Sequence, residues 1–325
     1  MKKLLLISFI AGILLVNINS IFAQNPIQRK GGTYFRISLQ SYAFNKLLND
    51  NVKGRGKGMS LYDLMDFCAE NNFDAVDLTD YYFPGYPDKL PTDEFIYNVK
   101  RRAYELGLSI SGTGVRNDFS NPDPVKRAAD VKHVKEWVDV AVKMGAPVVR
   151  IFSGAKLPEG SENKWDSVAN YMAADIKECV AYAKERGIMI AVQNHGDFLK
   201  TADETIKLVK LVNSDWFGII NDTGYFLTDD PYADIAKVMP YTVNFLLKES
   251  PIPLGSPVRI DLPRIIKILH DNNYRGFVNL ETLSARTPSK DKTKTDGAKS
   301  GYDPYTAVPA FLKMVKTAAA TEFGK

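Results

Sequence analysis

Short apolar runs alternate with longer amphipathic segments along most of the chain. The runs are typical of buried strands, and the segments between them repeat apolar residues at helical spacing. The predicted strands are residues 35–42, 75–78, 108–112, 147–152, 188–192, 217–220, 243–247 and 277–280. The predicted helices are residues 61–71, 92–106, 123–144, 165–186, 202–212, 231–238, 262–272 and 306–319. This alternation predicts an α/β protein of parallel βα units, and we expect a single-domain (β/α)8 TIM barrel.

Glycines stand between several predicted helices and the strands that follow them. Gly107, Gly145, Gly187 and Gly276 all occupy this place, and glycine commonly follows a helix end. The repeat favours a barrel over a doubly wound sheet. Residues 112–114, Gly-Thr-Gly, lack a further glycine that opens a helix, so we expect a loop there and no dinucleotide-binding fingerprint.

The N-terminal residues have the features of a secretory signal peptide. Lys2 and Lys3 precede an apolar core over residues 4–16, and Ala23 places a small residue before the expected cleavage point. An uncleaved anchor is the alternative. We expect a periplasmic or secreted protein that has no membrane contact after cleavage. The predicted divisions are a signal peptide (1–23), a linker (24–33), the barrel (34–320) and a tail (321–325).

The mature chain is expected to be almost neutral. The sequence has 42 basic and 38 acidic residues, and loss of Lys2 and Lys3 leaves 40 basic residues and a net charge of +2. The basic stretch at 290–299 also contains acids and small polar residues, which indicates a solvated loop. We therefore expect a small-molecule partner and no nucleic acid, and leave a homo-oligomer open. Cys68 and Cys179 lie in predicted helices and are either buried thiols or a disulfide.

Polar clusters follow four of the predicted strands at the point where each strand ends. In a TIM barrel the chemistry lies at the C-terminal ends of the strands, so we expect these clusters to share one pocket. Their recurrence about every thirty residues matches one strand-plus-helix unit. The clusters are residues 193–197, 221–224, 248–250 and 281–282.

Oxygen atoms in these clusters suit a divalent cation. Asp222, Glu281 and the amide oxygen of Gln193 are expected to converge from three strands. Oxygen ligands favour Mg²⁺ or Mn²⁺, and an added histidine nitrogen also admits Zn²⁺ or Co²⁺. The alternative is that these side chains cap strand ends and form turns.

His195 and Lys248 are the other catalytic candidates, beside Glu281. His195 shares a strand face with Gln193 and can shuttle a proton. Lys248 ends a mostly apolar strand, where it can contact a substrate oxyanion or instead form a salt bridge with Glu249 or Glu281. Aromatic rings near the same strand ends can stack on sugar faces. The predicted substrate-binding residues are Arg150, Asn194, Tyr42, Trp165 and Tyr225, with Asp77 and Arg116 as secondary site candidates.

Together these motifs resemble the sugar phosphate isomerase/epimerase family of the xylose isomerase-like TIM barrel superfamily. The matching residues are Asn194-His195, Asp222-Thr223-Gly224, Lys248-Glu249 and Glu281. The resemblance covers essentially the whole mature chain and implies a barrel with a divalent metal. The implied ligands are a glutamate, an aspartate, a histidine and a glutamate on strands five to eight, and the two glutamates also move protons.

Two of the four ligand positions differ from the pattern that the resemblance implies. Asp222 and Glu281 match, but Gln193 replaces the strand-five glutamate and Leu246 replaces the strand-seven histidine. Gln193 cannot act as a general base, so a two-base epimerisation loses one of its bases. We therefore expect a one-base reaction at Glu281 with weak or absent metal.

Three functions follow as hypotheses. The leading one is an exported sugar isomerase/epimerase-like enzyme that abstracts a proton beside a carbonyl of a sugar or keto-sugar. One alternative is a lyase or hydratase that acts on 3-keto sugars or glycosides and needs only one strong base. Another is a catalytically altered barrel that binds sugars. DNA repair is disfavoured, because relatives of that kind use several histidines and the predicted pocket offers only His195.

Overall fold

The computed structural model describes residues 24–154, 160, 164–195, 198–250, 258–282 and 302–323. The predicted signal peptide, residues 196–197 of the first polar cluster and the basic stretch at 290–299 lie outside these residues. Within the described ranges, no helix combines the length and the apolar character that a membrane crossing requires.

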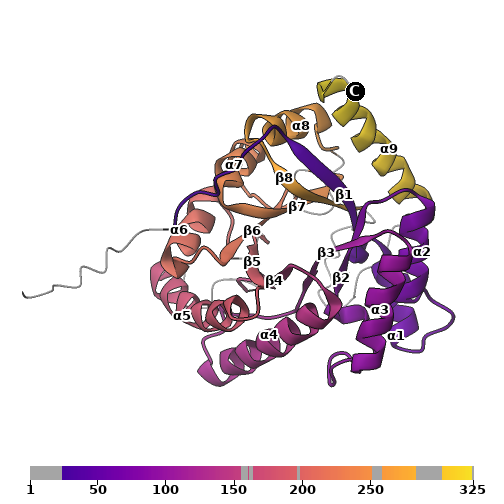
Figure 1. The fold of residues 1–325 in the computed structure, drawn as a ribbon. Helices are drawn as coiled ribbons and strands as arrows, with labels where there is room; N and C mark the ends of the chain where they lie inside the picture. The colour runs from indigo at the N-terminus through magenta and orange to yellow at the C-terminus, as the bar shows by residue number, and fades with distance from the viewer. Residues whose placement is uncertain are drawn as a thin grey trace, which may run out of the picture.

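The strands form a closed parallel barrel in the order β1-β2-β3-β4-β5-β6-β7-β8, which confirms the predicted (β/α)8 fold (Figure 1). Closure comes from β1 and β8, which pair in parallel from Tyr34↔Arg275 to Leu39↔Leu280. The strands are β1 (Tyr34–Gln40), β2 (Ala75–Thr79), β3 (Ser109–Gly114), β4 (Val148–Phe152), β5 (Met189–Gln193), β6 (Phe217–Asp222), β7 (Thr242–Lys248) and β8 (Arg275–Glu281).

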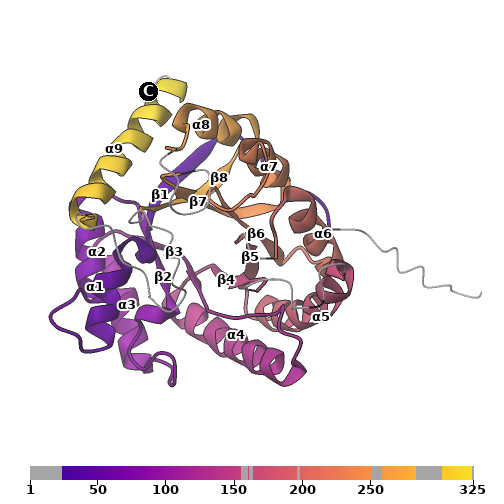
Figure 2. The same ribbon diagram turned by 180° about the vertical axis from the view of Figure 1, so that it is seen from behind.

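The helices form an outer ring around the strands, and α9 completes the ring beside α8 (Figures 1 and 2). Several begin with side-chain caps, such as the capping boxes of Ser60 at α2 and Thr201 at α6. The α-helices are α1 (Asn45–Val52), α2 (Leu61–Glu70), α3 (Asp93–Glu105), α4 (Pro124–Met144), α5 (Trp165–Lys184), α6 (Ala202–Val212), α7 (Pro231–Val238), α8 (Leu262–Asp271) and α9 (Pro304–Phe323). Single 3-10 turns are η1 (Ser41–Phe44), η2 (Asp80–Tyr82) and η3 (Met239–Tyr241).

The structure corrects three local predictions and adds one helix. The expected loop at 112–114 is the end of β3. Gly276 lies inside β8, and Asn273, with φ of 47°, adopts the left-handed conformation after α8 instead. Helix α1 was not predicted. Cys68 and Cys179 are both buried free thiols in α2 and α5, so the disulfide alternative is wrong.

The segment before β1 packs against the barrel. The side-chain amide of Gln24 donates to the carbonyl of Phe217 (2.6 Å). The backbone N–H of Ile27 donates to the carbonyl of Pro240 (2.8 Å). Arg29 donates from Nη1 to the carbonyl of Met239 (3.1 Å). The expected linker is therefore attached at the β6 and β7 strand starts, away from the C-terminal mouth.

The barrel interior has a polar half and an apolar half. The apolar half is a small cluster of Val148, Ala191, Ile220 and Leu246, contributed by β4 to β7. The polar half lies across β1, β3, β7 and β8 and is a buried chain of side-chain hydrogen bonds. Its contacts are Ser38 Oγ to Ser111 Oγ (2.7 Å), Ser111 Oγ to Asn279 Oδ1 (2.8 Å) and Asn279 Nδ2 to Asn244 Oδ1 (2.8 Å).

Substitution of Asn279 by alanine should destabilise the barrel. Asn279 accepts from Ser111 and donates to Asn244 and to the carbonyl of Phe245, so its loss leaves buried polar partners unsatisfied. We expect a loss of roughly 2–3 kcal/mol in the free energy of unfolding, measured by urea denaturation. The control Asn170→Ala, on the exposed face of α5, should change it by less than about 0.5 kcal/mol. Equal effects of the two substitutions would contradict a structural role for the polar half.

Candidate active site

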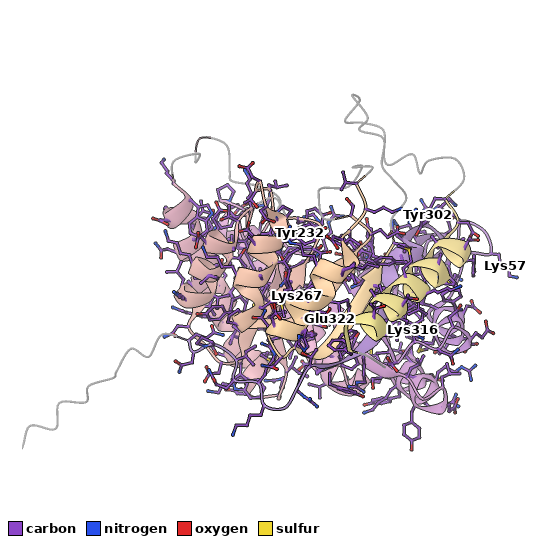
Figure 3. All side chains as sticks on the ribbon, turned by 90° about the horizontal axis from the view of Figure 1, so that it is seen from above. Lys57, Tyr232, Lys267, Tyr302, Lys316 and Glu322 are labelled. Carbon is purple, nitrogen blue, oxygen red and sulfur yellow. The ribbon has the colours of Figure 1, made fainter. Side chains whose placement is uncertain are left out.

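The candidate site lies at the C-terminal mouth of the barrel. Gln193, Asp222, Lys248 and Glu281 are the last residues of β5, β6, β7 and β8, and all four are buried. The strands are adjacent, and Lys248 and Glu281 are directly paired in the ladder. In the side view of Figure 3 the mouth is at the upper edge, where Tyr302 is labelled, because the Tyr302 hydroxyl lies 2.7 Å from Thr282 Oγ1 just after β8.

A lysine ammonium lies between two carboxylates at the centre of this group. Lys248 Nζ is 2.6 Å from Glu281 Oε1 and 3.6 Å from Asp222 Oδ2. Burial alone lowers the pKa of Lys248, but Asp222 and Glu281 outweigh it and hold the pKa well above its usual value. Lys248 is therefore a fixed positive charge at neutral pH. The sequence left open whether Lys248 contacts a substrate oxyanion or forms a salt bridge, and the structure contains the salt bridge with Glu281.

Asp222 is held by hydrogen bonds from three neighbours. Its Oδ1 accepts from the backbone N–H of Gly224 (2.9 Å), and its Oδ2 accepts from Gln193 Nε2 (2.5 Å). Asn194 uses both ends of its amide on the backbone of Asp222, accepting from N at 2.7 Å and donating to O at 3.0 Å. Asn194 was predicted to bind substrate, and the structure shows that its side-chain amide contacts the backbone of Asp222.

Aromatic rings form one wall beside the ammonium. The His195 ring lies against Tyr225, with 3.8 Å between ring centroids, and it meets Phe152 edge-on at 5.1 Å. Lys248 Nζ lies 5.1 Å from the Tyr225 ring centre, close enough for a cation–π contact. The structure thus brings His195 and Tyr225 to the Lys248 side of the mouth, as a flat, partly exposed surface beside buried charges.

A second charged group comes from β1, β2 and β4. Gln40 Nε2 donates to Asp77 Oδ1 (3.1 Å), and Arg150 donates from Nη1 to the carbonyl of Val115 (3.1 Å). Burial raises the pKa of Asp77 to about 6, although Arg150 and Gln40 oppose the shift. Asp77 thus exchanges its proton near neutral pH and is a stronger candidate than its secondary rank from sequence. A lone carboxylate inside the apolar run 75–78 was the available signal.

The two remaining predicted contact residues lie outside the strands. Tyr42 is half-buried in η1, directly after β1. Trp165 begins α5, where its ring stacks on Phe198 with centroids 5.0 Å apart, and its Nε1 donates to the Phe198 carbonyl at 3.4 Å. Lys207 also lies over the Trp165 ring. These contacts place Trp165 in packing between α5 and α6.

Glycines leave the space that the charged side chains occupy. A methyl group at Gly112 would lie 2.8 Å from Asp77 Oδ2, and one at Gly114 would lie 2.6 Å from Arg150 Nε. One at Gly224 would lie 2.6 Å from Lys248 Cδ. The Gly-Thr-Gly sequence that suggested a loop is therefore a strand end, and its two glycines leave the space in which Asp77 and Arg150 pack.

The donor atoms present do not match a divalent metal site. Among the described residues no group of three or more His, Cys, Asp or Glu side chains is arranged to hold a metal ion. Leu246 packs with Val148 and Ile220 in the apolar half and offers no ligand. For the possible Mg²⁺, Mn²⁺, Zn²⁺ or Co²⁺, the described ends of β5 to β8 offer the carboxylates of Asp222 and Glu281 and the amide of Gln193.

Comparison with known proteins agrees with this architecture. The chain matches the model of the xylose isomerase-like TIM barrel family over residues 65–301. It belongs to that family. No curated protein sequence matches the chain.

Solved structures of proteins named as sugar epimerases share this fold at low sequence identity. D-psicose 3-epimerase with D-tagatose from Clostridium cellulolyticum H10 has 16% identity and a TM-score of 0.69, over 88% of this chain and 99% of that one. L-ribulose 3-epimerase has 16% identity and a TM-score of 0.66, over 89% and 97%. 3-Keto-D-glucoside 4-epimerase from E. coli has 13% identity and a TM-score of 0.64, over 87% and 100%.

Substitution of Asp77 by asparagine should stabilise this xylose isomerase-like barrel at neutral pH. Because the folded-state pKa is raised from 3.8 to about 6, ionisation of Asp77 costs the fold stability as the pH rises through this window. A shift of about two units corresponds to at most about 3 kcal/mol. The melting temperatures of wild type and Asp77→Asn should therefore differ little at pH 4, and Asp77→Asn should melt at the higher temperature at pH 7. The control Asp203→Asn, on the surface of α6, should show no such trend, and a pH-independent difference for Asp77→Asn would contradict the shift.

Substitution of Gly114 by alanine should displace Arg150. The added methyl group would meet three atoms of the guanidinium group at 2.6–2.7 Å, and Arg150 is buried, so the strand or the side chain must move. We expect a loss of about 1–3 kcal/mol in the free energy of unfolding. Gly32→Ala is the matched control, since a methyl group there has nothing within 4 Å. If both variants unfold at the same urea concentration as wild type, the close packing across Gly114 is incorrect.

Proposed function

We propose that this protein is an enzyme of the sugar isomerase/epimerase type that abstracts a proton beside a carbonyl of a sugar or keto-sugar. The observation that carries the proposal is the buried Glu281–Lys248–Asp222 group at the barrel mouth, with Nζ 2.6 Å from Glu281. A carboxylate next to a fixed ammonium is the pair that such a reaction needs: one group takes the proton, and the other stabilises the negative charge that develops on oxygen.

The steps assign one role to each residue. Glu281 accepts the proton from the carbon beside the carbonyl, the C–H electron pair forms a C=C bond, and the carbonyl electrons move onto oxygen as an enediolate. Lys248 donates a hydrogen bond to that oxygen. For isomerisation, His195 moves the proton of the neighbouring hydroxyl onto the former carbonyl oxygen. The new C=O bond then forms at the neighbouring carbon, and Glu281 delivers its proton to the former carbonyl carbon. Tyr225 and His195 provide a flat surface for the sugar ring.

The comparisons support a keto-sugar as the substrate class. D-psicose 3-epimerase and L-ribulose 3-epimerase are named for ketoses, and the E. coli neighbour is named for a 3-keto-D-glucoside. These names belong to proteins with 13–16% identity, and for this chain the keto-sugar remains our proposal. We also propose that the protein is exported, on the basis of the basic and apolar pattern of residues 1–23.

A lyase or hydratase acting on a 3-keto sugar or glycoside is the second candidate, because of Asp77. Elimination needs one base at carbon and one acid that protonates the departing oxygen. The pKa of Asp77, raised to about 6 by burial, suits such an acid near neutral pH. In this reaction Glu281 removes the proton, the C–O bond breaks, and Asp77 protonates the leaving group.

The decisive variant is Glu281→Gln. Wild-type protein incubated in D₂O with a panel of ketohexoses and 3-keto-glucosides should exchange a carbon-bound hydrogen for deuterium, observed by ¹H NMR. Glu281→Gln should lower the exchange rate about 10²–10⁴-fold, because the base is lost, while sugar binding measured by calorimetry is retained. The control Glu185→Gln, exposed at the end of α5, should exchange like wild type.

Each other outcome points to a different function. A wild-type product that has lost water or an alcohol identifies the lyase or hydratase. Sugar binding without exchange or cleavage by wild type would sink the enzyme proposal and leave the sugar-binding barrel. Full exchange by a folded Glu281→Gln protein would remove Glu281 from the base role.

A further inference from the structure

A side chain of this protein lies between the two carboxylates at the barrel mouth. Lys248 Nζ lies in contact with Glu281 Oε1 at 2.6 Å and within 3.6 Å of Asp222 Oδ2. The side chain of Lys248 is 7% exposed, and those of Asp222 and Glu281 are 0% and 5% exposed, so water screens these charges little. The ammonium is therefore the counter-ion of both carboxylates.

The oxygen atoms that a metal would use are already engaged. Asp222 Oδ1 accepts from Gly224, and Asp222 Oδ2 accepts from the amide nitrogen of Gln193. Gln193 thus presents N–H groups to Asp222, whereas a metal requires its oxygen. Magnesium and manganese take about six oxygen ligands, and the neighbouring inward position, Leu246, contributes only carbon.

Two residues that follow β6 hold the Lys248 side chain in place. Gly224 has no side chain, and a methyl group there would meet Lys248 Cδ at 2.6 Å and Lys248 Cε at 3.4 Å. Thr223 Oγ1 accepts from the backbone N–H of Lys248 at 2.9 Å, which fixes the base of the side chain. Lys248 is therefore held from its backbone to its tip.

We propose that the Lys248 ammonium takes the place of a divalent cation, so that this barrel neither binds nor requires a metal at its mouth. The charge balance agrees: one ammonium between two carboxylates leaves a single negative charge, and a divalent ion would have to enter against the ammonium. The inference that no metal binds does not depend on the proposed reaction. The further step, in which Lys248 stabilises the enediolate oxygen that a metal would otherwise bind, rests on the proposed function.

Binding of Mn²⁺ tests the proposal without any activity measurement. Protein treated with EDTA and then freed of it is titrated with Mn²⁺, and the free ion is followed by electron paramagnetic resonance. Wild type and the exposed-lysine control Lys237→Met should leave the signal unchanged. Lys248→Met should bind Mn²⁺ at least about tenfold more tightly than wild type, because the competing charge is removed. One tightly bound Mn²⁺ per wild-type chain that is lost in Glu281→Gln would overturn the proposal.

A built metal site provides a second, independent comparison. Gln193→Glu and Leu246→His add two ligands beside Asp222 and Glu281, and they can be made with Lys248 kept or changed to methionine. We expect the protein that also carries Lys248→Met to bind Mn²⁺ at least about tenfold more tightly than the protein that keeps Lys248. Equal binding by the two proteins would refute the proposal that the ammonium excludes the metal. If wild type binds Mn²⁺ yet exchanges deuterium, only the metal-free inference fails. If it binds none and shows no exchange, only the proposed function fails.

Discussion

The structure of the barrel mouth depends on one interaction, the buried ammonium of Lys248 between Glu281 and Asp222. Transfer of three charges out of water costs several kcal/mol for each ion, and such groups seldom add stability compared with apolar residues of similar size. Their presence at three consecutive strand ends is therefore explained by chemistry rather than by folding. The neighbouring residues serve the same end, since Asn194 orients Asp222 and Gly224 leaves room for the lysine.

The fold could be predicted because its determinants are local and repeated. Apolar runs and helical spacing gave all eight strands in order, and Gly107, Gly145 and Gly187 do adopt positive φ after their helices. The prediction was wrong at Gly276 because Asn273 can also adopt the left-handed conformation. The loop expected at 112–114 was wrong for a different reason: its glycines make room for side chains from β2 and β4, and no local pattern contains that information.

The site could be predicted only as far as strand ends determine it. Gln193, Asp222, Lys248 and Glu281 meet because adjacent parallel strands end at the same edge of the barrel. What each polar atom contacts depends on neighbouring strands, and the sequence does not reveal it. Asn194 was therefore assigned to substrate although Asp222 uses both ends of its amide. Asp77 was ranked low because burial, which raises its pKa, appears only in three dimensions.

The division of the interior into two halves explains how a lysine can act where a metal ion is expected. Below the mouth, an apolar cluster is formed by Val148, Ala191, Ile220 and Leu246 on β4 to β7, and these apolar surroundings strengthen the attraction between Lys248 and Asp222. On the other side the hydrogen-bonded chain through Asn279 fixes β8, and with it Glu281, without adding a charge. Because Glu281 and Asp222 hold the ammonium, it stays at the mouth, where its donor hydrogens can turn toward a substrate oxygen. A lysine on a flexible loop would lack this preorganisation, and electrostatic stabilisation of an enediolate depends on it.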